Sequence, residues 1–213
     1  MLELINNDQP VVRRDPIKTR EKLLQSAYQQ IHEHGFQTAS LDEILRDTGV
    51  TKGALYHHFP NKNALGYAVV EEIIAPMLAE FWINPVVDSD DPVVAMQQVI
   101  RETGESMSMQ ELKLGCPLNN LSQEMSATDE GFRLRLDQIY DQWRGALSVA
   151  LQDGKAKGCV AAHVDPVTTA AFLVASLEGC IGMAKNSQDM NILLQCGQGI
   201  NDFLETLKGD VKC

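Results

Sequence analysis

Hydrophobic residues recur along most of this chain in steps of three and four. That spacing places them on one face of an α-helix. Leu24, Ala27 and Ile31 show it near the N-terminus. Runs that alternate apolar and polar residues between hairpin turns, the signature of strands, are absent from the sequence. The pattern therefore predicts an all-α protein.

Local signals then divide the first part of the chain into short helices. A first helix is predicted over 17–34, with Gly35 as its C-terminal cap. Ser40 and Glu43 have the spacing of a capping box, which predicts the start of a second helix over 41–47.

A tight turn at Gly49 follows, and Thr51 caps a third helix over 52–58. A fourth helix starts at Asn61, and Pro76 falls inside its pattern, where proline bends a helix. Longer helices are predicted beyond it, over 92–107, from Pro117, through a long segment ending at Gly154 and Gly158, over 166–186 and over 189–207.

Composition narrows the class of protein. The chain has 213 residues, of which 44% are hydrophobic, a fraction typical of a folded domain. We find no apolar run near the ~20 residues of a membrane span and no signal-peptide core at the N-terminus. We therefore expect a soluble, cytoplasmic protein with no membrane partner.

The cysteines favour a reducing compartment. Their number is odd and no CxxC pair occurs, which argues against a disulfide framework and against a structural zinc site. The five are Cys116, Cys159, Cys180, Cys196 and Cys213.

Charge is unevenly distributed. Residues 1–62 carry eight basic and eight acidic residues, whereas 63–213 carry ten basic and 21 acidic residues, which is the whole net charge of −11. An acidic body repels DNA, so any binding to nucleic acid must come from a local basic face.

The segment TKGALYHHFPNK, residues 51–62, concentrates chemically active side chains. A metal site is disfavoured because His57 and His58 are adjacent and point about 100° apart on a helix. Neither a Walker loop nor a GxSxG motif occurs in the sequence. We therefore expect no catalytic residues, no metal, no cofactor and no enzymatic activity.

A contact surface has better geometric support. Two short helices joined by the turn at Gly49 form a helix-turn-helix, whose second helix turns Leu55 and Phe59 inward. The outward residues are of types that contact phosphates and base edges. A solvated basic face with no partner is the alternative. The outward residues are Thr51, Lys52, Gly53, Tyr56 and His57, with Lys62 at the start of the next helix.

Residues 19–70, TREKLLQSAYQQIHEHGFQTASLDEILRDTGVTKGALYHHFPNKNALGYAVV, resemble the DNA-binding head of TetR-family transcriptional regulators. The most specific part is TGVTKGALYHHFPNK. The resemblance implies a flexible tail over 1–16, a three-helix, homeodomain-like head over 17–62, and a larger helical body over 63–213. The body would bind a ligand and form the dimer.

The resemblance also implies roles for individual residues. Lys52, Gly53, Tyr56 and His57 match the recognition helix. Thr38, Ser40, Thr51 and Lys62 match positions that hold phosphates. The implied partner is double-stranded DNA with a palindromic operator, released when a small-molecule effector binds. Repression is the expected mode, and an activator using the same head is the alternative.

The body contains adaptable apolar residues that would suit a ligand cavity. Ordinary helical core is the alternative for each of them. The candidates are Trp82, Met96, Met107, Met125, Tyr140, Trp143 and Phe172.

The segment KLGCPLNNLSQEMS, residues 113–126, is similar to one found in a subset of TetR-type regulators, some of which sense electrophiles or oxidants at the matching cysteine. Cys116 precedes Pro117 and so lies at a helix N-terminus, where the helix dipole favours a thiolate. We therefore consider Cys116 a candidate sensor thiol. A small structural cap is the alternative.

Small residues mark the helix predicted over 166–186, including Ala175, Gly179 and Gly182. Such residues let helices approach closely, and Leu193, Ile200 and Leu204 supply an apolar stripe on the last helix. Two copies of this helix pair would form a four-helix bundle about a two-fold axis. The sequence thus predicts a homodimer through the last two helices.

Overall fold

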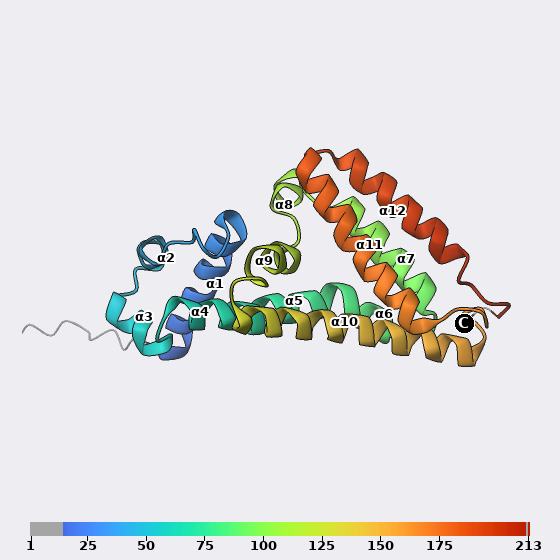
Figure 1. Ribbon diagram of the computed structural model, residues 1–213, viewed down its shortest axis with the longest axis horizontal. Helices are drawn as coiled ribbons and strands as arrows, with labels where there is room; N and C mark the ends of the chain where they lie inside the picture. The colour runs from blue at the N-terminus through green and yellow to red at the C-terminus, as the bar shows by residue number, and fades with distance from the viewer. Residues whose placement is uncertain (1–14, 212) are drawn as a thin grey trace, which may run out of the picture.

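A computed structural model describes residues 15–211 and 213. The described chain is elongated and helical, with a small head at one end and a larger body at the other (Figure 1). The one backbone pairing of strand type within the described part is an isolated antiparallel bridge between Val160 and Lys208. The predicted all-α class is confirmed.

The head consists of α1 (Pro16–His34), α2 (Leu41–Thr48) and α3 (Lys52–His58). The α1 helix starts one residue earlier than predicted because Asp15 caps it and Pro16 fits its first turn. Residues 1–14 of the tail predicted over 1–16, with Arg13 and Arg14, lie outside the described residues, whereas Asp15 and Pro16 belong to the start of α1.

Caps define the two shorter helices of the head. The Ser40 hydroxyl accepts a hydrogen bond from the Glu43 backbone N–H at 3.4 Å, so half of the predicted capping box forms. The Glu43 carboxylate pairs with Arg46 instead of returning to Ser40. Gly49 ends α2 at φ 64°, a left-handed conformation that favours glycine.

A continuous helical rod leads from the head into the body. It contains two π-helical stretches, and Pro76 lies in the short α-helix between them, where a proline removes one backbone hydrogen bond. The helix type changes on both sides of this proline, and the bend expected there stays a prediction. The segments are α4 (Lys62–Val69), η1 (Val70–Ile74), α5 (Ala75–Leu78), η2 (Ala79–Ile83) and α6 (Asn84–Val87).

Six further helices complete the body, and one of them, α8, was not predicted. Its start carries a full capping box between Ser108 and Glu111, a signal that is readable in the sequence. The helices are α7 (Pro92–Ser106), α8 (Met109–Leu114), α9 (Pro117–Met125), α10 (Glu130–Lys157), α11 (Pro166–Ser187) and α12 (Met190–Glu205).

The rod runs beside α10 along one side of the molecule (Figure 1). Asp129, the cap of α10, accepts hydrogen bonds from Asn63 at 2.8 Å and from the Tyr67 hydroxyl at 2.7 Å. Arg135 pairs with Glu71 at 2.7 Å further along. These contacts fix α10 to the rod from the head outward.

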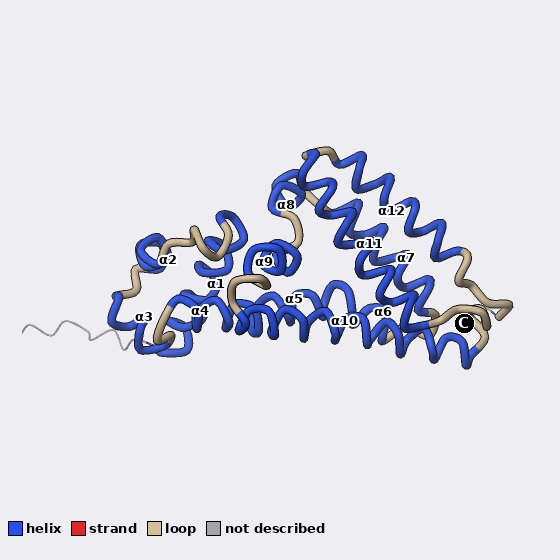
Figure 2. The backbone as a smooth tube through the Cα atoms, viewed as in Figure 1, coloured by secondary structure: helices blue, strands red, loops and turns tan. Residues whose placement is uncertain are grey.

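The C-terminal segment corrects the cysteine prediction. Cys159 and Cys213 form a disulfide with their Cα atoms 5.7 Å apart, although the sequence argued against disulfides. The pairing was hidden because 54 residues separate the two cysteines along the chain. Backbone bonds from Gly209 to Cys159 and from Ala161 to Leu207 hold the segment beside the α10–α11 loop, at the end far from the head (Figure 2).

One helix also departs from the expectation about membranes. The 22-residue α11 is long and apolar enough to cross a bilayer by length and composition, with a mean hydropathy of 1.6. In the structure it packs against both α10 and α12. Its buried residues, among them Leu173, Val174 and Leu177, belong to the main core.

We predict that Gly66→Ala destabilises the fold. A Cβ at Gly66 would lie 2.5 Å from Phe36 and 2.6 Å from Phe132, whose rings pack edge to face between head and body. Overpacking of this kind costs about 1–3 kcal/mol in the free energy of unfolding, measured by urea denaturation.

Gly145→Ala is the matched control, because a Cβ at this exposed position of α10 meets no atom within 4 Å. It should raise the free energy of unfolding by up to about 1 kcal/mol through helix propensity. Equal effects of the two substitutions would show that the Phe36–Phe132 contact does not constrain Gly66.

Candidate DNA-binding surface and effector site

The helix α3, which the sequence predicts as the recognition helix, is oriented by two buried residues. Leu55 is fully buried and Phe59 is 2% exposed, and both join the core that also holds Leu24 and Ile44. Lys52, Gly53 and His57 are exposed, and 42% of Tyr56 is exposed. The structure therefore brings the predicted base-reading residues together on one outward face, where a Cβ on Gly53 meets no atom within 4 Å.

The predicted phosphate contacts flank this face. Thr38 is exposed in the turn between α1 and α2. The hydroxyls of Ser40 and Thr51 each accept a hydrogen bond from a backbone N–H in the first turn of their helices, at 3.4 and 3.3 Å. Both hydroxyls still have a hydrogen to donate to a phosphate oxygen.

Lys62 is already engaged within the protein. Its ammonium group donates to the Gln37 carbonyl at 3.0 Å and lies 4.9 Å from the centre of the Phe36 ring. Partial burial lowers the pKa of Lys62, although Glu124 opposes the shift. A phosphate contact by Lys62 would require its side chain to leave the Gln37 carbonyl.

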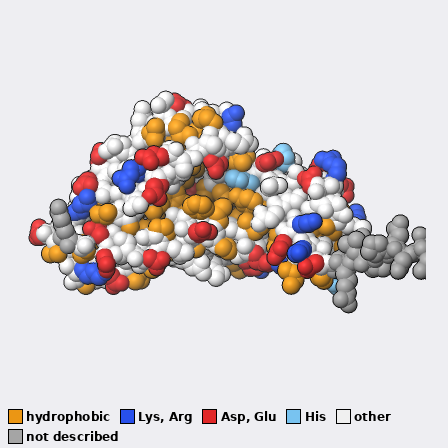
Figure 3. All heavy atoms as spheres, turned by 180° about the vertical axis from the view of Figure 1, so that it is seen from behind, with side chains coloured by type: hydrophobic (Ala, Val, Ile, Leu, Met, Phe, Trp, Pro, Cys, Tyr) orange, Lys and Arg blue, Asp and Glu red, His pale blue; other side chains and the backbone are white. Residues whose placement is uncertain are grey.

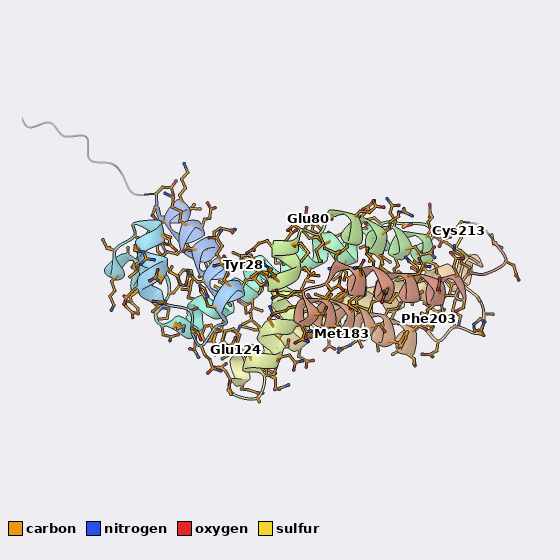
Figure 4. All side chains as sticks on the ribbon, turned by 90° about the horizontal axis from the view of Figure 1, so that it is seen from above. Tyr28, Glu80, Glu124, Met183, Phe203 and Cys213 are labelled. Carbon is orange, nitrogen blue, oxygen red and sulfur yellow. A yellow bond between two sulfur atoms is a disulfide. The ribbon has the colours of Figure 1, made fainter. Side chains whose placement is uncertain are left out.

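The head is joined to the body by Glu124 of α9. Its carboxylate accepts the backbone N–H groups of Phe36 and Gln37, each at 2.8 Å. Figure 4 shows Glu124 where α9 meets the head. Gly35 leaves room for this contact, because a Cβ there would lie 3.0 Å from the carboxylate. Charge-assisted bonds of this kind are stronger than neutral ones.

Further bonds cross from α1 to the rest of the chain. His32 contacts the Gly115 carbonyl at 2.8 Å through Nε2, and burial lowers the pKa of His32, so this nitrogen carries the hydrogen of a neutral ring. Arg20 pairs with Glu72 on the rod, with one hydrogen bond of 2.6 Å, and this bond holds the pKa of the Glu72 carboxyl low.

Two of the pockets in the body adjoin each other. An open groove of about 530 Å³ lies between α7, α11 and α12. Beneath it, an inner pocket of about 10 Å³ has an entirely apolar lining. Of the predicted ligand residues, Trp82 lines both pockets, while Met96 and Trp143 line the inner one.

The other four predicted ligand residues lie outside these two pockets. Met125 is buried in the main core, and Met107 packs against a small second cluster around Leu112. Burial raises the pKa of Tyr140, and the nearby Glu178 carboxyl adds to this shift.

Phe172 requires a different assignment. It is 51% exposed, and its ring packs edge to face on Phe203 of α12 at 4.9 Å. The sequence could not show that Phe172 is exposed, because α11 is apolar on several sides. Its neighbour Leu173 lies on the buried face of the helix. Phe172 belongs to the outer face of the α11–α12 pair.

Cys116 also departs from its prediction. It is the N-cap of α9, as expected, but burial and the nearby Glu178 raise the pKa of its thiol well above the ordinary value. Backbone hydrogen bonds at the helix start oppose this shift and are outweighed. The resting side chain is therefore a protonated thiol, whose Sγ donates to Glu178 Oε1 at 3.3 Å.

Glu178 is the unusual group at this site. It is 6% exposed, and burial raises its pKa to about 7. Its Oε2 atom is buried with no hydrogen-bond partner among the described residues. In the sequence, the only sign that Glu178 is unusual is that it is the single acidic residue of the apolar helix predicted over 166–186.

We predict that Cys116 reacts slowly with iodoacetamide in the folded protein. Because its pKa is raised, the thiolate fraction is small at pH 7, and the rate should still be rising with pH above 9. Mass spectrometry of the peptide that contains Cys116 measures this rate.

Protein unfolded in urea is the control, because there Cys116 should react as an ordinary thiol with a pKa of about 8.5. A rate in the folded protein that is already maximal at pH 7 would restore the thiolate interpretation.

Comparison with known proteins agrees with this architecture. Residues 23–69 match the family model for bacterial regulatory proteins of the tetR family, and residues 92–196 match the model for the tetracyclin repressor-like C-terminal domain. The first covers most of the head and the start of the rod, and the second runs from α7 into α12.

Individual relatives extend the match along the chain. The chain is 28% identical to the transcriptional regulator AcuR of Cereibacter sphaeroides over 80% of this chain and 78% of that protein. It is 29% identical to the transcriptional repressor NemR of Escherichia coli over 88% and 94%. The crystal structure of NemR in its reduced form aligns with a TM-score of 0.77 at 25% identity, covering 91% of this chain and all of that one. The chain belongs to the TetR family of helix-turn-helix, DNA-binding transcriptional regulators.

Proposed function

We propose that this chain is a cytoplasmic homodimeric repressor that binds a palindromic operator in double-stranded DNA and is released by a small molecule. The observation that carries the proposal is the outward face of α3, where Lys52, Tyr56 and His57 are exposed above a buried Leu55. Such a helix fits the major groove, and a two-fold dimer reads two half-sites. The repressor NemR supports the mode of action by likeness.

The acidic body favours DNA contact through the head alone. Residues 63–213 hold the entire net charge of −11. Acidic side chains outnumber basic ones over the face of the body seen in Figure 3. A negative body repels phosphates, so the head must supply the attraction and the register.

The outer face of α11 and α12 supports dimerisation. Phe172 and Met183 are 51% and 58% exposed, respectively. A Cβ on Gly179 or on Gly199 would meet no atom within 4 Å, so both helices offer open backbone for close approach. Figure 4 shows Met183 and Phe203 along this helix pair. An apolar face of this kind suits a self-complementary interface.

Release would follow from movement of the head relative to the body. An effector that prefers a conformation with misplaced heads weakens operator binding, with a coupling typically of about 1–3 kcal/mol. The rod, the α9 contact through Glu124 and the His32–Gly115 bond are connections that would carry this movement. An activator would use the same head, since the position of the operator decides between the two outcomes.

We expect selection of genomic DNA fragments to enrich a short inverted repeat with the wild-type protein. The Lys52→Ala/Tyr56→Ala double variant should enrich none, because each lost base contact costs about 1–3 kcal/mol.

Lys113→Ala is the matched control, because Lys113 is an exposed lysine on α8, away from the head. It should select the same repeat as wild type. Selection of the repeat by the double variant would refute α3 as the recognition helix.

A second candidate function is thiol-based sensing at Cys116. The structure favours it by position: Cys116 contacts Glu178 of α11, and the neighbouring Gly115 carbonyl is bonded to His32 of the head. An adduct on a buried thiol does not fit without displacing this loop. Modification would thereby break the bond to the head.

We predict that Cys116→Ser binds the operator with unchanged affinity but no longer releases it after treatment with N-ethylmaleimide. Gel-shift titration before and after treatment measures both properties. Cys196→Ser, which removes a half-buried thiol on α12, is the control and should respond as wild type. Release of the operator by treated Cys116→Ser would reject the sensor role.

A further inference from the structure

Two cysteines outside the sites described above lie on neighbouring helices. Cys180 belongs to α11 and Cys196 to α12, and both are free thiols that are half-buried. Each lies between two buried residues of its own helix, three positions from one and four from the other, so both share the buried side of their helices. The flanking residues are Leu177 and Ala184 for Cys180, and Leu193 and Ile200 for Cys196.

The packing of the two helices brings these cysteines to the same level. A turn of two residues joins α11 to α12, so the helices run antiparallel, and they pack against each other (Figure 1). Phe172 and Phe203 face each other across this pair, with ring centres 4.9 Å apart. Cys180 lies eight residues after Phe172, and Cys196 lies seven residues before Phe203. Their positions along the helix axes therefore differ by about one residue, or about 1.5 Å.

The two side chains contact each other directly. The thiol of Cys180 is hydrogen-bonded to Cys196, and burial together with this neighbour raises the pKa of Cys180 to about 12. Cys180 therefore keeps its hydrogen at pH 7 and donates it to the sulfur of Cys196. The pair thus consists of an accepting sulfur with a protonated thiol beside it.

A small oxidant can reach the pair from the groove between α7, α11 and α12. Cys180 lines this groove of about 530 Å³, and so does Gly197, which follows Cys196 and has no side chain. The groove stays open in the dimer proposed above. Asn201 of α12 lines it, whereas Phe203, two residues further on, points the other way.

We propose that Cys180 and Cys196 form a reversible redox site, which closes to a disulfide between α11 and α12 when a hydroperoxide oxidises it. The sulfur of Cys196 attacks the peroxide, the O–O bond breaks, and Cys196 becomes a sulfenic acid while an alcohol or, from hydrogen peroxide, water leaves. The sulfur of Cys180 then displaces the hydroxyl group, which leaves as water with the hydrogen of Cys180. The two thiols supply the two electrons that reduce the peroxide.

This site is separate from the candidate sensor thiol Cys116, which is bonded to Glu178. A disulfide in a reducing compartment is usually transient, and exchange with a small thiol would reopen this one. The closed form links the two helices that supply the proposed dimer face, so it would hold this face together under oxidising conditions. The inference does not depend on DNA binding, because its test is made on the protein alone.

The test oxidises the reduced full-length protein with hydrogen peroxide and then blocks the remaining thiols with iodoacetamide. Digestion after lysine and glutamate separates the five cysteines, with Cys180 on residues 179–185 and Cys196 on residues 186–205. Mass spectrometry should find these two peptides joined, and dithiothreitol should release them. Recovery of both peptides unjoined, whether alkylated or carrying added oxygen, would overturn the proposal.

Two variants check the assignment. Cys180→Ser removes the thiol that closes the disulfide, so Cys196 should accumulate as sulfinic acid at a peroxide concentration that joins the wild-type peptides. Cys196 that stays a thiol in this variant would contradict the reaction. Cys116→Ser keeps both thiols and should form as much joined peptide as wild type. Loss of the joined peptide in Cys116→Ser would reject an independent site, and the wild-type result stands even if Cys180→Ser does not fold.

Discussion

The placement of the head depends on one carboxylate that belongs to the body. Glu124 accepts two backbone N–H groups of the α1–α2 turn at 2.8 Å, so the turn that leads into the helix-turn-helix is completed by a residue of α9. A charged acceptor makes such backbone hydrogen bonds strong. The Arg20–Glu72 pair holds the same head to the rod, and His32 bonds to the Gly115 carbonyl, so the head has further attachments besides Glu124.

The head could be predicted from the sequence almost residue by residue, because its signals are local. Thr51 caps α3 and Gly49 turns the chain. Leu55 and Phe59, four residues apart, both point into the core of the head. Each of these acts within four residues of its own position. The bounds of α3 agree with the prediction at both ends, and the outward face contains the residues expected there.

The body was predictable as helices but not as a site, because its chemistry comes from helices that are far apart in sequence. The helix dipole at Cys116 is local and was identified, yet burial and Glu178, which is 62 residues away, outweigh it. The Cys159–Cys213 disulfide likewise joins distant segments. Phe172 follows the same rule, since its exposure depends on how α11 packs and not on its own hydrophobicity.

This contrast has a physical consequence for regulation. A head specified by local signals keeps its own shape when its position changes, since Leu55 and Phe59 remain buried within it. The body, by contrast, is held by contacts between distant segments. Within the described part of the chain, three of its polar atoms are buried without hydrogen-bond partners, namely Trp143 Nε1, Glu178 Oε2 and Asn201 Oδ1. Unmet groups of this kind lower the cost of rearrangement, because a new arrangement or a ligand can satisfy them. The head can therefore move as a rigid unit while the body supplies the second state.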